Sequence, residues 1–285
     1  MPTRALLRRL PPPGLMKAHL RFCAMLDAIV SPELRSFEFH PAWAENEQMG
    51  AFKDTEGDCF FAWFSAQGAV VRGFAHESPM SPYRKNPPEP WVSLWDGLSA
   101  SLSYAKTEPA FGGDDVTFAC WTEGQDGLWT AGPVKPPADK DPDGAESLLF
   151  GPFSKGFHRW AEGYYDQKLA SAAIEALGAK DRTLVSATVI ALNPTFDLQA
   201  VENEAKALDW PVDLAEASTA APVPESPPRP PRARSFGSVE FIVRCEPARV
   251  VMLIHGQKVV AEAGVNVYEE LFDLVKARLQ AAKKH

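Results

Sequence analysis

The chain has 285 residues, of which 45% are hydrophobic and 23% are charged, as in an ordinary globular protein of one or two domains. Its longest apolar runs, residues 60–64 and 250–254, are five residues each, far short of the about 20 that a membrane-spanning helix needs. We therefore expect no membrane association.

The net charge of −8 is concentrated in the middle of the chain. Residues 1–36 carry +4 (6 Lys and Arg, 2 Asp and Glu), residues 37–217 carry −15 (13 against 28), and residues 218–285 carry +3 (10 against 7). Nucleic-acid binding needs clustered lysine and arginine, so this distribution argues against a nucleic-acid partner. It favours a basic protein partner, attracted by a force that weakens with salt. The alternative is that the acidity only keeps the protein soluble.

The N-terminus and the cysteines indicate a cytoplasmic protein. The first 14 residues contain arginines but no apolar stretch ahead of the triple proline, which argues against a secretory signal. The cysteines are widely spaced and form no C-x-x-C pair, which is typical of reduced residues and not of a disulfide framework. They are Cys23, Cys59, Cys120 and Cys245.

Helical and strand patterns alternate along the first 217 residues. We expect a helix over 15–29, a strand over 34–40, an antiparallel meander of 48–53, 59–64 and 69–74, a helix over 90–102, and a hairpin of 116–121 and 127–131. A long helix over 152–177 and a short one over 197–208 follow, with 183–191 ambiguous between strand and helix. The turns within the meander are too short for crossover helices, which predicts an α+β fold with an antiparallel sheet flanked by helices.

A proline-rich segment divides the chain. Residues 218–234 read STAAPVPESPPRPPRAR, which is too poor in apolar residues to fold and is held extended by its prolines. We therefore predict an acidic α+β body (1–217), a linker (218–234) and a small βββα domain (235–285). The predicted elements of that domain are strands over 238–245, 249–254 and 258–263 and a helix over 267–279.

Two clusters of residues suggest chemistry. Asp139, Asp141 and Asp143 have the D-x-D-x-D-G spacing with which calcium loops collect oxygen ligands, although Phe150 stands at the twelfth position, where such loops have a bidentate glutamate. The alternative is an acidic surface loop that enters a helix near Leu148, with Asp143 or Ser147 as its cap. We expect no cofactor, with Ca²⁺ at residues 139–147 as the one exception to test.

The second cluster forms if strands 59–64 and 69–74 pair. Their pairing would bring Asp58 and Cys59 close to His76 and Glu77, and a Cys–His or His–carboxylate couple can perform acid–base or nucleophilic catalysis. The alternative is that Cys59, which opens an apolar strand, is a packed core residue. The chain has no H-E-x-x-H, G-x-x-x-x-G-K-[ST], G-x-G-x-x-G or G-x-S-x-G motif, which argues against the commonest zincins, P-loop NTPases, dinucleotide enzymes and nucleophile-elbow hydrolases.

Most of the eight tryptophans fall on the apolar faces of predicted elements. Trp43 and Trp210 lie outside those elements and are candidate partner contacts. The leading hypothesis is a non-enzymatic cytosolic protein, of the immunity or antitoxin kind, that engages a basic protein through an acidic face. The alternatives are an enzyme of unknown class using His76 with Asp58, Glu77 or Cys59, and a two-domain adaptor. The sequence does not predict an oligomeric state.

Overall fold

The structure is a computed structural model that describes residues 4–125, 127–150, 153, 157–178 and 183–214, together with four strands between residues 232 and 262. The chain divides into two compact units, Met1–Thr219 and Ala220–His285. Residues 218–231 of the predicted linker and the predicted helix over 267–279 lie outside the described residues. Among the described helices, none is long and apolar enough to cross a membrane.

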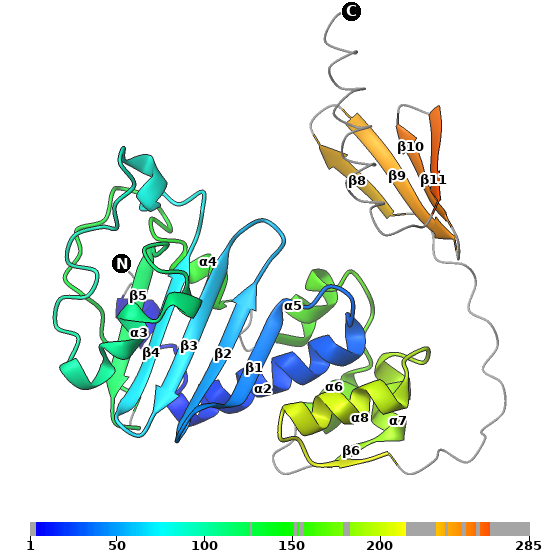
Figure 1. Ribbon diagram of the computed structural model, residues 1–285, viewed down its shortest axis with the longest axis horizontal. Coiled ribbons are helices and arrows are strands. Elements are labelled where there is room, and N and C mark those ends of the chain that lie inside the picture. Colours follow the sequence, from blue (N-terminus) through cyan, green and yellow to red (C-terminus); the bar gives the residue numbers. More distant parts are fainter. Residues whose placement is uncertain are drawn as a thin grey trace, which may run out of the picture. The chain divides into compact units, whose positions relative to one another are not determined.

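A five-stranded antiparallel sheet forms the centre of the first unit (Figure 1). The strands lie side by side in chain order, and every neighbouring pair is antiparallel. Together with the helices, this confirms the predicted α+β class with an antiparallel sheet. The strands are β1 Phe37–Ala44, β2 Glu47–Lys53, β3 Cys59–Ser65, β4 Gly68–Phe74 and β5 Phe118–Glu123.

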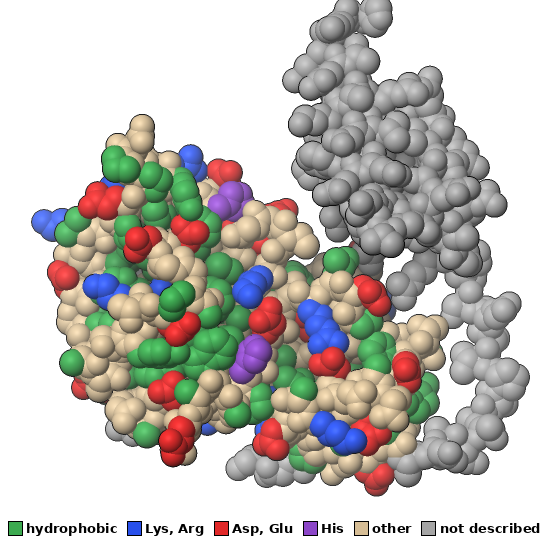
Figure 2. All heavy atoms as spheres, in the orientation of Figure 1, with side chains coloured by type: hydrophobic (Ala, Val, Ile, Leu, Met, Phe, Trp, Pro, Cys, Tyr) green, Lys and Arg blue, Asp and Glu red, His purple; other side chains and the backbone are tan. Residues whose placement is uncertain are grey.

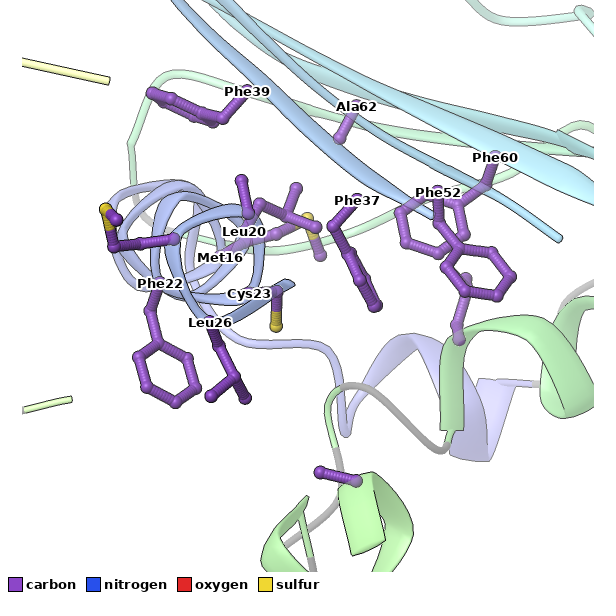
Figure 3. Close-up of a cluster of buried hydrophobic side chains, with 14 of the residues drawn as sticks. Met16, Leu20, Phe22, Cys23, Leu26, Phe37, Phe39, Phe52, Phe60 and Ala62 are labelled. Atoms are coloured by element: carbon purple, nitrogen blue, oxygen red, sulfur yellow. The ribbon is translucent and has the colours of Figure 1, made fainter. Parts of the chain in front are cut away.

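Helix α2 (Pro13–Val30) packs against the first face of this sheet. In Figure 3, Leu20 points toward the sheet, whereas Phe22 and Leu26 point away from it. On that other side α2 contacts α6 (Ser171–Gly178), α7 (Ser186–Leu192) and α8 (Leu198–Ala207), so it is buried between the sheet and an outer layer of helices. A Cβ at position 50 would lie 2.8 Å from Leu20 Cδ1, which explains why β2 has glycine where α2 crosses it.

The second face of the sheet is covered by the chain between β4 and β5. Phe61 and Trp63 of β3 are buried there against Leu102 and Phe111. This covering segment, residues 75–117, contains only short helical pieces: η1 Pro82–Arg84, η2 Ala100–Leu102, α3 Tyr104–Thr107 and η3 Pro109–Phe111. Strand β3 is therefore buried on both faces, which accounts for its unbroken run of apolar residues.

Arg72 ties the covering segment to the sheet. It leaves the middle of β4, is 1% exposed, and donates hydrogen bonds to the carbonyl oxygens of Gly113 (2.5 Å), Asp115 (3.3 Å) and Lys106 (3.4 Å). Its guanidinium also lies over the Trp95 ring, 5.7 Å from the centroid. Burial lowers the pKa of Arg72. An irregular segment has carbonyl groups that no helix or strand satisfies, and here one buried side chain supplies their donors.

Asp27 joins the end of α2 to the start of β1. The side chain is 0% exposed, and its Oδ2 accepts hydrogen bonds from the backbone N–H groups of Ser36 (2.6 Å) and Phe37 (2.8 Å). Burial raises the pKa of Asp27 to about 6, even though both hydrogen bonds and the nearby Tyr165 hydroxyl act in the opposite direction. The junction therefore contains a carboxyl group that is costly to ionise.

The predicted helix over 90–102 is wrong. Ser93 (φ 67°) and Gly97 (φ 93°) have left-handed backbone conformations, which an α-helix cannot include. The apolar spacing that suggested a helix instead serves two separate clusters, because Leu94 packs with Met80 and Leu98 packs in the cluster on the second face.

Three other predicted elements differ from the structure. The long helix over 152–177 is two helices, α5 (Phe157–Tyr164) and α6, separated by a turn in which Asp166 has a φ of 50°. The hairpin strand over 127–131 is reduced to one bridge, from Thr130 to Trp121. The ambiguous stretch splits into β6 (Leu184–Val185), parallel to β7 (Val212–Asp213), and α7.

The described part of the second unit is a four-stranded antiparallel sheet with the order β11-β10-β9-β8. Three of its strands coincide to within one residue with the three predicted ones, and β8 begins inside the predicted linker. The strands are β8 Arg232–Phe236, β9 Val239–Glu246, β10 Arg249–Ile254 and β11 Gln257–Glu262.

Replacing Arg72 by Met should lower the unfolding free energy by about 3 kcal/mol or more, because three carbonyl oxygens lose their donor inside the protein. Urea denaturation followed by tryptophan fluorescence measures this, since all eight tryptophans lie in the first unit. Arg72→Lys keeps the charge but has fewer hydrogen-bond donors. Its unfolding free energy should therefore lie between those of the wild type and the Met variant. A loss below about 1 kcal/mol in the Met variant would show that the cover does not depend on Arg72.

Asp27→Asn should change how stability depends on pH. The folded pKa, about 6, lies above the ordinary value of 3.8, so the folded state binds more protons than the unfolded state in this interval. The wild type then loses roughly 3 kcal/mol from this group as the pH rises from about 4 to about 6. Asparagine can still accept both backbone N–H groups but does not titrate, so the variant should lack that loss.

The measurement is the difference in unfolding free energy between wild type and Asp27→Asn, taken from about pH 4 to about pH 8. Groups common to both proteins cancel in this difference. Two parallel stability curves would contradict the assignment of a raised pKa to Asp27.

Candidate functional site

The pairing of β3 with β4 brings together three of the four residues in the predicted catalytic cluster. Cys59 lies opposite Phe74 in the sheet, so Asp58 meets His76 at the same end. His76 Nδ1 lies 2.7 Å from Asp58 Oδ1, and the same oxygen accepts the backbone N–H of His76 at 2.8 Å. Glu77 Oε1 lies 3.4 Å from the other ring nitrogen, Nε2.

This geometry favours the protonated form of His76. The hydrogen bond to Asp58 raises the pKa of the imidazole above its usual 6.5, and the charges of Asp58 and Glu77 add to the rise. The two flanking carboxylates therefore make the imidazole more basic and increase the fraction that is protonated at a given pH. Glu77 is also bound by Arg84 at 3.2 Å.

Cys59 is not activated as a nucleophile. Its side chain is half-buried and packs against the cluster on the second face. Burial raises the pKa of the thiol above its usual value, which disfavours the reactive thiolate. The geometry is that of the packed residue named as the alternative.

The aspartates of the predicted calcium loop act as turn and helix caps. Asp141 accepts hydrogen bonds from the backbone N–H and the hydroxyl of Ser147 at 2.8 and 2.7 Å, and Asp139 accepts the backbone N–H of Asp141 at 3.0 Å. Asp143 bonds to the backbone N–H of the first residue of α4 (Ala145–Phe150) at 3.2 Å. Within the described residues, no three His, Cys, Asp or Glu side chains are placed to hold a metal ion.

Trp43 lies in β1, where the sequence predicted no strand, and belongs to an aromatic group at the border of the second face. Its ring is stacked on Phe111 at 5.6 Å and makes a T-shaped contact with His40 at 5.5 Å. Its indole N–H donates to the Tyr104 hydroxyl at 3.1 Å. Trp43 is half-buried and Tyr104 is 38% exposed, so part of this group faces solvent.

Two carboxylates are bound to the same aromatic group. Trp63 donates its indole N–H to Glu47 at 2.9 Å, and its ring lies 5.4 Å from Tyr104. The hydrogen bond from the Tyr104 hydroxyl lowers the pKa of Glu108, which favours a charged carboxylate there. Figure 2 shows hydrophobic side chains gathered over β2 and β3, with Asp and Glu side chains around them.

Trp210, the other predicted partner contact, packs against the hydrophobic core on the first face of the sheet, which α2 covers. The Arg21 guanidinium lies 5.3 Å from its ring centroid. Its backbone N–H bonds to Ala205 at the end of α8. The half-buried side chain is thus engaged inside the unit.

The acidic charge of the first unit is paired in one region and unpaired in another. In the helical layer, Glu204 binds Arg35 and Glu202 binds Lys206, both at 2.7 Å. In residues 45–47 and the covering segment, six carboxylates have no Lys, Arg or His of the described residues within salt-bridge distance, although the charges of Asp114 and Asp115 act to raise the pKa of the buried Arg72. They are Glu45, Glu47, Asp96, Glu108, Asp114 and Asp115, and we call them the second-face carboxylates.

Comparison with known proteins found no similar protein: no family model, no curated protein and no solved structure matches the chain.

The sequence reasoning missed three residues of the aromatic group, which are distinguished only by their contacts: Tyr104, Glu47 and Glu108. Glu47 directly precedes the predicted strand over 48–53, and its contact is with Trp63 of the neighbouring strand. No local pattern marks Tyr104 or Glu108, because the covering segment that holds them is irregular.

Asp58→Asn should lower the pKa of His76, because asparagine can still accept both hydrogen bonds but carries no charge. Titration of the imidazole proton resonances by NMR measures this. Glu77→Gln should lower the pKa by less, since its oxygen lies farther from the ring. An unchanged pKa in Asp58→Asn would show that the pair does not form in solution.

Proposed function

We propose that this protein is a non-enzymatic cytoplasmic binding protein that engages a basic protein partner through the second-face carboxylates. The observation that carries this function is the presence of unpaired carboxylates beside partly exposed aromatic rings. Aromatic residues are enriched in protein interfaces, and depletion of balancing positive charge leaves a surface that attracts basic partners.

The distribution of charge supports a partner over mere solubility. Residues 75–117 carry 3 Lys and Arg against 6 Asp and Glu, a net −3. Asp96 and Asp114 line a cavity of about 260 Å³ in this segment, together with Trp91, Trp95 and one basic residue, Lys106. A surface that served solubility alone would not need aromatic rings and a cavity among its charges.

The His76 cluster supports the enzyme alternative less well. The thiol of Cys59 is favoured in its neutral form, whereas an activated Cys–His dyad pairs a thiolate with an imidazolium. An immunity or antitoxin role remains the kind of function that fits best, because such proteins neutralise a basic partner by binding alone. The second unit would be free to recruit a further partner, which is the adaptor alternative.

The test is affinity capture with the full chain, first at low salt and then at about 0.5 M salt. We expect the retained partner to be basic and to be released as salt is raised, because surface charges are screened at that concentration. Charge-neutral variants of the second-face carboxylates, Asp96→Asn with Asp114→Asn, should retain less of it. An acidic partner, or capture that is indifferent to salt, would contradict the proposed function.

A further inference from the structure

Two lysines of this chain are held in the same way, each between an aromatic ring and a carboxylate. Lys53 lies 5.5 Å from the centroid of Phe61 and 3.3 Å from Glu38. Lys85 lies 5.7 Å from the centroid of Trp91 and 3.4 Å from Glu89. Both pairs therefore combine the ring's attraction for a cation with a nearby negative charge.

The group around Trp43 has the same two components. Trp43 and Tyr104 supply aromatic surface that is partly open to solvent, and Glu47 and Glu108 supply the carboxylates. Glu45 lies exposed in the adjoining turn between β1 and β2. Of the described residues, no Lys or Arg lies over either ring or within salt-bridge distance of these carboxylates.

Contacts within the group hold these side chains in position. Phe111 stacks on Trp43, the Trp43 indole N–H is fixed on the Tyr104 hydroxyl, and the Glu108 carboxylate also accepts the backbone N–H of Ala110 at 3.0 Å. A basic group that bound here would meet rings and carboxylates already oriented, so little side-chain entropy would be lost on binding.

We propose that the aromatic group of Trp43 and Tyr104, with Glu47 and Glu108, is the site that receives a lysine or arginine side chain of the partner protein. The site deepens the function proposed above and rests on it. Charge complementarity selects the occupant, since a neutral or acidic side chain would leave the carboxylates without a counter-charge. Arginine fits better than lysine, because its planar guanidinium can stack on a ring and bond to a carboxylate together.

The test uses the full chain, labelled with ¹⁵N at the indole nitrogens, and a short arginine–glycine peptide as the probe. The same peptide with citrulline in place of arginine is the uncharged control. The Trp43 indole resonance is identified by its loss in Trp43→Phe. We expect it to shift with the arginine peptide, to saturate, and to stay unmoved by the citrulline peptide.

Glu47→Gln and Glu108→Gln should each lower the affinity for the arginine peptide about threefold. Trp43→Leu, which removes the ring, should lower this affinity by at least as much. Both glutamines can still accept the native hydrogen bonds, so they keep the fold intact even if Trp43→Leu does not. Glu175→Gln, an exposed carboxylate on α6, is the matched control and should have no effect. Equal affinity in the Glu47, Glu108 and Glu175 variants, or no shift at Trp43, would overturn this site.

The two levels of function fail differently. A basic, salt-sensitive partner whose capture ignores Glu47→Gln and Glu108→Gln would overturn this site and leave the proposed function standing. A saturable response at Trp43 without any basic partner in the capture experiment would support the site as a receptor for basic side chains and contradict the proposed function.

Discussion

Strand β3 turns Phe60 and Phe64 to one face of the sheet and Phe61 and Trp63 to the other, and all four are buried. Burying a large apolar side chain is worth about 1.5–3 kcal/mol, so both faces of the sheet require a cover. On the first face the cover is a helix, α2, with its own second layer behind it. On the second face it is the chain that connects β4 to β5, and the two covers have different consequences.

A helix satisfies its own backbone, whereas an irregular segment does not. The second cover therefore depends on a donor inserted from the sheet, and Arg72 supplies it to three carbonyl groups. A buried arginine is costly to desolvate, and here its charge is shared among carbonyl oxygens and the Trp95 ring. The irregular cover also leaves the border of the sheet incompletely buried, so that Trp43 and Tyr104 remain partly exposed. The surface that we propose binds a partner is in this sense a consequence of how the second face is closed.

The central sheet could be predicted from the sequence because its signals are local. Strands over 48–53, 59–64 and 69–74 are joined by short turns, and their pairing also predicts that Asp58 meets His76. The helix over 90–102 could not be excluded in this way, since Trp91, Leu94 and Leu98 have helical spacing in the sequence. The helix is ruled out by tertiary structure. Two residues of this stretch have left-handed backbone conformations, and its apolar side chains pack in two different clusters. Likewise, D-x-D-x-D-G spacing predicts where carboxylates lie along the chain. It does not predict whether backbone N–H groups, and not a metal ion, bind to them.

Net charge has the same weakness as a predictor, because it counts carboxylates without their partners. The net charge of −15 on residues 37–217 includes carboxylates such as Glu204, which forms an ion pair with Arg35 inside the unit. Asp58 is likewise paired within the unit, since it accepts two hydrogen bonds from His76 and raises the pKa of the imidazole. The proposed partner would meet the smaller set of carboxylates that no described Lys, Arg or His binds, and aromatic rings nearby would help to bind the same cation. Glu47 and Glu108 satisfy both conditions, because each is hydrogen-bonded to an aromatic side chain and neither is bound by a described basic residue.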